Sequence, residues 1–187
     1  MIMTTTQNTQ TMTTTTITTE AMAATINGAV ARAAAETPVR IDFAKANPKA
    51  FKAIIALNAA ATEHLDPALV ELVQIRASQL NSCAYCLHMH VSDARKAGED
   101  PERLHMVGVW REAPHFFTPP ERAALALTEA VTLIADGGVE DEVFEEAAEE
   151  FSEQELGGLL ALIFTINTWN RLNVTARKVA GTDERVR

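Results

Sequence analysis

The chain has 187 residues, of which 47% are hydrophobic, and it carries a formal net charge of −9. This length suits one globular domain with its own core, and no apolar run approaches the roughly 20 residues that span a bilayer. The negative charge argues against binding to nucleic acid or to an anionic membrane surface. Two cysteines are too few for a secreted disulfide scaffold.

The first 36 residues differ in composition from the rest of the chain. Residues 1–25 hold twelve threonines with almost no periodicity, and the first arginine is Arg32. This stretch has neither the basic and apolar segments of a secretory signal nor the arginines of a transit peptide. We therefore predict a disordered or loosely attached extension over 1–36, with one short helix over 21–35, and a cytoplasmic location.

Residues 37–187 are predicted to form a single all-α domain. A capping residue precedes proline at Asn47, Asp66 and Asp100, and capping boxes begin at Thr118 and Ser152. The apolar residues between these signals follow the 3.6-residue period of a helix, and no alternating strand pattern competes with it. The predicted helices cover 48–63, 67–80, 83–97, 101–107, 119–135, 140–150 and 153–179.

One predicted helix is strongly acidic. Residues 140–155 contain nine acids and no lysine or arginine. This pattern favours a solvated helix face, and a docking face for a basic partner is the alternative.

The residues that can carry chemistry gather between Asn81 and His90. Ser82 is predicted to cap a helix, which places Cys83 at the first helical position, where the helix dipole favours a thiolate. Cys86 and His90 lie on the same helix face as Cys83. A Cys-x-x-Cys pair at a helix start is a redox arrangement, in which one thiolate attacks and its neighbour closes a disulfide. Two alternatives are inert buried cysteines and a helical interaction module with zinc on Cys83, Cys86 and His90.

Glu71 interrupts an apolar run in the preceding helix. It shares a helix stripe with Gln74 and Ser78, and that stripe could simply be wet. The functional alternative is a carboxylate that faces the cysteine helix and accepts a proton there.

Together these residues form the pattern E-x11-C-x-x-C-x3-H, from Glu71 to His90. The pattern, the run from Leu80 to His90 and the later run from Thr165 to Asn173 resemble the AhpD-like alkylhydroperoxidase branch of the carboxymuconolactone decarboxylase family. The resemblance covers roughly residues 40–180. Tyr85 stands where some members carry a histidine.

The resemblance implies an all-α AhpD-like fold that assembles into homo-oligomers, commonly trimers or hexamers. The apolar helices and the Gly157-Gly158 pair, which would permit close helix contacts, point the same way. The resemblance also implies thiol-dependent reduction of hydroperoxides without metal, haem or flavin. In this pattern Cys86 attacks the peroxide, Cys83 resolves the product, and Glu71 and His90 relay the proton.

Three functions follow as hypotheses. The first is a peroxidase for hydrogen or alkyl hydroperoxides that is reset by a dithiol donor, such as a dihydrolipoamide-bearing or thioredoxin-like protein. The second is a general disulfide reductase or redox sensor with little peroxidase turnover. The third, lactone decarboxylation, is disfavoured because that branch of the family generally lacks the cysteine pair.

Overall fold

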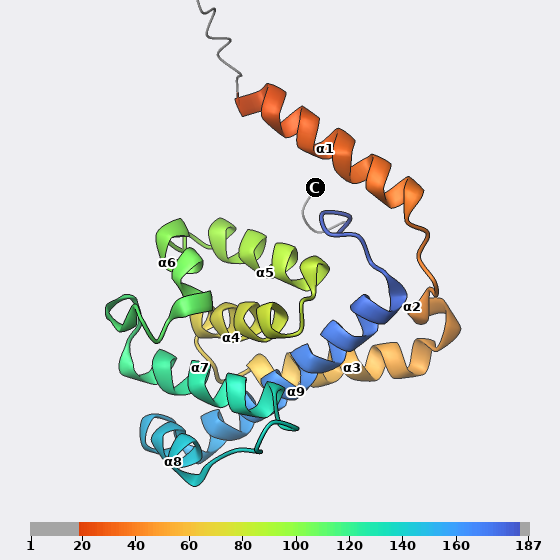
Figure 1. The fold of residues 1–187 in the computed structure, drawn as a ribbon. Helices are drawn as coiled ribbons and strands as arrows, with labels where there is room; N and C mark the ends of the chain where they lie inside the picture. Colours follow the sequence, from red (N-terminus) through yellow and green to blue (C-terminus); the bar gives the residue numbers. More distant parts are fainter. Residues whose placement is uncertain (1–18, 184–187) are drawn as a thin grey trace, which may run out of the picture.

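The computed structural model describes residues 19–183, and within them the chain forms only helices and connecting segments (Figure 1). The α-helices are α1 (Thr19–Glu36), α2 (Phe43–Ala46), α3 (Pro48–Thr62), α4 (Pro67–Leu80), α5 (Ala84–Lys96), α6 (Pro101–Met106), α7 (Pro119–Thr132), α8 (Asp141–Glu150) and α9 (Glu153–Ala176). Two 3₁₀ turns, η1 (Val107–Val109) and η2 (Pro114–Phe116), join α6 to α7. The predicted all-α fold class is therefore confirmed.

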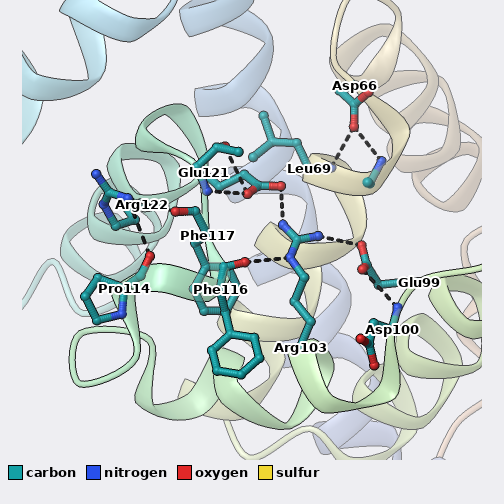
Figure 2. Close-up of polar contacts among 12 residues, drawn as sticks. Asp66, Leu69, Glu99, Asp100, Arg103, Pro114, Phe116, Phe117, Glu121 and Arg122 are labelled. Atoms are coloured by element: carbon teal, nitrogen blue, oxygen red, sulfur yellow. Dashed lines mark hydrogen bonds and ion pairs between the residues drawn. The ribbon is translucent and has the colours of Figure 1, made fainter.

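Local capping sets most of the helix starts, as the sequence predicts. The Asp66 carboxylate accepts hydrogen bonds from the backbone N–H groups of Ala68 and Leu69, at 2.9 and 3.2 Å, and so starts α4 (Figure 2). Asn47 and Asp100 cap α3 and α6 in the same way. Both predicted capping boxes are present, at the starts of α7 and α9. These caps satisfy backbone donors that a helix start leaves without intrahelical partners.

Helix α4 is the central element of the core. It packs against α5, α7 and α9, while α3 lies along α9. Leu72, Val73 and Ile75 on α4 have no exposed surface, because apolar residues surround this helix on almost every side. The functional residues described below lie on α4, on α5 and on the last turns of α9.

The segment that follows α9 lies beside the middle of α1, where Gly181 approaches Val30. Figure 1 shows α1 running along the outside of the molecule beside the segment that follows α9. Of the predicted N-terminal extension, residues 19–36 form α1, which includes the helix expected over 21–35. Residues 1–18 lie outside the described residues.

Three predicted features differ in detail from the structure. Helix α7 ends at Thr132 and not at residue 135, because Leu133 adopts a non-helical conformation, with φ −98° and ψ 29°. Helix α9 ends at Ala176 and not at residue 179, because Arg177 adopts a left-handed conformation, with φ 58° and ψ 46°. Of the glycine pair, only Gly158 makes a close helix contact, since a Cβ atom there would lie 3.1 Å from the Ala61 carbonyl oxygen. A Cβ atom on Gly157 would meet open space. The acids of α8 are exposed, as a solvated face requires.

Candidate active site

The two cysteines lie at the junction of α4 and α5. The junction is so short that Ser82 still hydrogen-bonds back to Gln79 of α4, with a left-handed φ of 54°. Ser82 therefore does not cap α5, and this prediction was wrong. The cap is Cys83, whose Sγ accepts the backbone N–H of Cys86 at 3.4 Å, so that α5 begins at Ala84.

The cysteine side chains face each other inside the protein. The Cys83 thiol lies 2.6 Å from Cys86 Sγ and donates a hydrogen bond to it. Cys83 is 1% exposed and Cys86 has no exposed surface. Ala77, Ile166 and Trp169 pack around them. The pair is therefore close enough for disulfide chemistry but out of reach of bulky reagents.

Cys86 is the more acidic of the two thiols. Its pKa falls from the ordinary value of 9.0 to about 6, mainly because the Cys83 thiol donates to its sulfur. Amide donors from Asn173 and Asn170 and the charge of His90 act in the same direction, and burial opposes them. The same contact with Cys86, reinforced by burial, raises the pKa of Cys83 far above its ordinary range. The helix-dipole argument for a Cys83 thiolate is thus overridden by the contacts of the pair.

Glu71 reaches across from α4 to the cysteine helix. Its Oε2 lies 2.9 Å from Nδ1 of His90, and the two side chains are 22% and 8% exposed. Gln74 and Ser78, on the same stripe of α4, are buried, so the alternative of a wet stripe is wrong. An ionised carboxylate only accepts hydrogen bonds. The contact therefore places a proton on Nδ1 and leaves Nε2 of His90 as the basic nitrogen.

A surface cavity of about 330 Å³ reaches the outer end of this pair. It lies between α4, α5 and α6, and Glu71, Ala94 and Leu104 are among the residues that line it. Neither cysteine lines this cavity. Glu71 is thus the member of the site with a path to solvent.

The zinc alternative on Cys83, Cys86 and His90 is not formed among residues 19–183. The grouping of possible metal ligands found there consists of Glu71, His90 and Asp93, with donor atoms within 4.8 Å of one another. Both thiols lie outside it.

Sequence reasoning assigned no role to four asparagines beside the thiol pair, namely Asn81, Asn167, Asn170 and Asn173. Asn173 Nδ2 lies 3.3 Å from Cys86 Sγ, and Asn170 Nδ2 donates to Ser78 Oγ at 3.0 Å. Asn81, at the end of α4, donates to the Oδ1 atoms of Asn167 and Asn170 at 2.9 Å. The signal was the spacing of Asn167, Asn170 and Asn173, which places three amides on one face of an otherwise apolar helix.

The fold and the site define an all-α protein with a buried cysteine pair at a helix start and a carboxylate–imidazole pair beside it. Residues 48–130 match the sequence pattern of the carboxymuconolactone decarboxylase family. The uncharacterized protein YdfG of Bacillus subtilis is 43% identical over 104 residues, which are 56% of this chain and 70% of YdfG. The chain belongs to the carboxymuconolactone decarboxylase family.

Solved structures agree with this assignment. A protein of unknown function from Agrobacterium tumefaciens, described as an AhpD protein of antioxidant defence, is 39% identical, with a TM-score of 0.73 over 78% of this chain and 100% of its own. An uncharacterized peroxidase-related protein from Ralstonia eutropha, with an alkylhydroperoxidase AhpD core, has a TM-score of 0.64 over 74% of each chain. At 22% identity, the latter shows the fold alone. The resemblance to AhpD-like proteins is therefore confirmed.

Proposed function

We propose that the protein is a thiol-dependent peroxidase that reduces hydrogen peroxide or alkyl hydroperoxides. The observation that carries this proposal is the polarised cysteine pair, in which Cys86 has a pKa of about 6 and Cys83 lies 2.6 Å away as a hydrogen-bond donor. A thiolate, and not a thiol, is the nucleophile toward peroxide. At neutral pH Cys86 is thus the nucleophile and Cys83 holds the proton.

The proposed catalytic cycle has three steps: attack on the peroxide, formation of a disulfide, and reduction of that disulfide. The Cys86 thiolate attacks the outer peroxide oxygen, the O–O bond breaks, and the leaving alkoxide or hydroxide takes a proton to become alcohol or water. The Cys83 thiol then attacks the Cys86 sulfenic acid and releases water, which leaves a disulfide. A dithiol donor reduces this disulfide by two exchange steps and is itself oxidised to a disulfide.

The Glu71–His90 pair supplies the proton transfers of this cycle. The basic Nε2 of His90 takes a proton from the thiol pair and returns it to the leaving oxygen, while Glu71 holds the imidazole in the required tautomer. The 2.9 Å contact between them and the cavity that Glu71 lines support this role. Protons exchange with solvent through that cavity.

The burial of the two cysteines disfavours the alternative of a general disulfide reductase. A folded protein disulfide cannot approach sulfurs that are 1% exposed or less. A small peroxide reaches them after a much smaller local opening of the protein. For the same reason we propose a slender dithiol, such as a dihydrolipoyl arm, as the electron donor, in preference to a thioredoxin-like protein. The proposed setting is the cytoplasm, where thiols stay reduced between turnovers.

We also propose that the protein works as a homo-oligomer, a trimer or a hexamer. Four large apolar side chains on the paired helices α3 and α9 are about half exposed: Ile55, Leu57, Phe164 and Val174. Exposed apolar side chains on neighbouring helices indicate an interface. We propose another copy of the chain as the partner that covers these side chains. Among residues 19–183, no helix is both long and apolar enough to cross a membrane. Light scattering at micromolar concentration tests the proposed homo-oligomer, and a stable monomer would contradict it.

The decisive test is peroxide consumption with dihydrolipoamide or a thioredoxin system as donor. Wild type should turn over with dihydrolipoamide. Cys86→Ser should be inactive, and Cys83→Ser should consume one equivalent of peroxide and stop at the sulfenic acid. Loss of two thiols per chain without a covalent dimer should accompany oxidation of the wild type. Retention of both thiols under excess peroxide would refute the proposal, and rapid reduction of a protein disulfide without peroxide turnover would favour the reductase.

A further inference from the structure

The last turns of α9 bring an amide to the sulfur of Cys86. Asn173 is 8% exposed, and its Nδ2 lies 3.3 Å from Cys86 Sγ. This contact crosses between two helices that are far apart in the sequence. An amide N–H that donates to sulfur favours the thiolate, because the bond to a charged acceptor is stronger than the bond to a neutral thiol.

The position of Asn173 is held by the end of its own helix. Its carbonyl oxygen accepts the backbone N–H groups of Arg177 and Lys178, and the left-handed conformation of Arg177 closes the helix there. These hydrogen bonds fix the backbone of the last turn of α9, and with it the position of the Asn173 side chain. Such a fixed donor needs little reorganisation when charge develops on the sulfur.

One turn earlier on α9, Asn170 is fully buried beside the same thiols. Its Nδ2 donates to Ser78 Oγ at 3.0 Å, and its Oδ1 accepts from Asn81 at 2.9 Å. An amide nitrogen carries two protons, so one remains for the thiol pair. The Asn170 amide lowers the pKa of Cys83 and of Cys86, in the same direction as Asn173 acts on Cys86. Two amides of one helix thus face the thiol pair.

We propose that Asn173 is a catalytic residue that stabilises the Cys86 thiolate through its Nδ2–H···Sγ hydrogen bond, and that Asn170 positions the thiol pair beside it. This inference rests on the proposed function, in which Cys86 attacks as a thiolate. The Cys86 thiolate is then stabilised by Asn173 as well as by the Cys83 thiol and the charge of His90. The contact with Asn173 also assigns a role to the end of α9.

The test measures the thiolate directly, by its ultraviolet absorbance as a function of pH in the reduced protein. Cys86→Ser identifies the low-pH transition as that of Cys86. Asn173→Leu keeps the side-chain size and removes the donor, so the transition midpoint should rise by about one pH unit or more. The rate of peroxide reaction near pH 6 should then fall by about tenfold, with a smaller loss at high pH.

Thr165→Val is the matched control. Thr165 is a fully buried polar residue of the same helix, but its hydroxyl donates to the Ala161 carbonyl of that helix at 2.7 Å. Its loss should lower stability and leave the thiolate midpoint at the wild-type value. A folded Asn173→Leu variant with the wild-type midpoint would overturn the inference.

A measurement on the wild type covers the case in which Asn173→Leu does not fold. The side-chain amide resonances of Asn173 in an NMR titration should shift with the Cys86 midpoint, and this transition should vanish in Cys86→Ser. Resonances that do not respond to pH would overturn the inference. A wild type that shows the coupled titration but consumes no peroxide would refute the proposed function and leave the thiolate contact standing.

Discussion

Two polar clusters of low exposure, one around Arg103 and one around Cys86, serve different purposes in the same small domain. In the Arg103 cluster the guanidinium forms ion pairs with Glu99 and Glu121, and its Nε donates to the Phe116 carbonyl at 2.9 Å (Figure 2). The guanidinium also lies over the Phe117 ring. These contacts connect α6 to the segment between α5 and α6 and to the start of α7.

The two clusters differ in whether their charged groups can lose or gain a proton near neutral pH. Burial lowers the pKa of Arg103, but the carboxylates of Glu121 and Glu99 outweigh it and raise that pKa, so this cation never releases a proton at physiological pH. In the site around Cys86 the charge can change, because the pKa of Cys86 falls to about 6 and its proton exchanges near neutrality. Charged clusters of similar burial can therefore serve stability in one place and chemistry in another.

The largest effect should come from Glu71→Gln. A neutral amide can no longer hold the His90 tautomer or take up its charge, so the reaction with peroxide should slow by about 10²–10⁴-fold. Peroxide consumption and the pH dependence of thiol alkylation measure this. The matched control is Glu99→Gln, which alters a carboxylate that lines the same cavity but binds Arg103. That control should lose stability and keep the wild-type reaction rate.

His90→Ala should reproduce the damage of Glu71→Gln. Because the two residues act as one unit, the double variant should be little slower than either single one. Additive losses in the double variant would separate Glu71 from the relay.

Arg103→Met should have the next largest effect, and on folding alone. It leaves two carboxylates of low exposure without their cation, which should lower the free energy of unfolding by about 3 kcal/mol. Urea denaturation measures this, with Glu102→Gln on the same helix as an exposed control. The thiolate titration of the folded fraction should stay at its wild-type midpoint. A shifted midpoint would show that the two clusters are coupled.

The pH dependence of stability should carry a separate signature of the thiol site. Between pH 6 and 9.0 the folded protein has lost the Cys86 proton that the unfolded chain keeps. The free energy of unfolding should therefore rise with pH in this window, by at most about 1.4 kcal/mol per unit, and the gain is lost below pH 6. Cys83, whose pKa is raised, lowers stability only above this window. Denaturation of the reduced protein should show the slope, and Cys86→Ser should remove it.

The smallest effect is expected at Arg111. This exposed side chain belongs to a second ion cluster, in which Arg76 and Arg111 both bind Glu129. The Arg111 guanidinium pairs with Glu129 at 2.8 Å and lies over Trp110, but its side chain is 59% exposed. Arg111→Ala should therefore cost less than about 1 kcal/mol. Arg76, which binds the same carboxylate at 15% exposure, is the buried counterpart, and Arg76→Met should cost several times more. Equal losses would show that exposure does not separate these ion pairs.

The sequence by itself determined the helices and the composition of the reactive segment. Caps such as Asp66 with Pro67, and the capping box at Ser152, act within one turn and can be read from neighbouring letters. The helical period likewise places Cys86 and His90 on one face of α5. Signals of this kind need no knowledge of the rest of the chain.

Only the tertiary structure decided which thiol is acidic and what surrounds it. Because the junction of α4 and α5 is short, the cap of α5 is Cys83 and not the predicted Ser82. The packing of α4 on α5 places Glu71 next to His90. The end of α9 places Asn173 in contact with Cys86, although the two residues are 87 positions apart in the sequence. Hydrogen bonds between helices depend on how the helices pack, and packing depends on the whole core, so no local pattern specifies them.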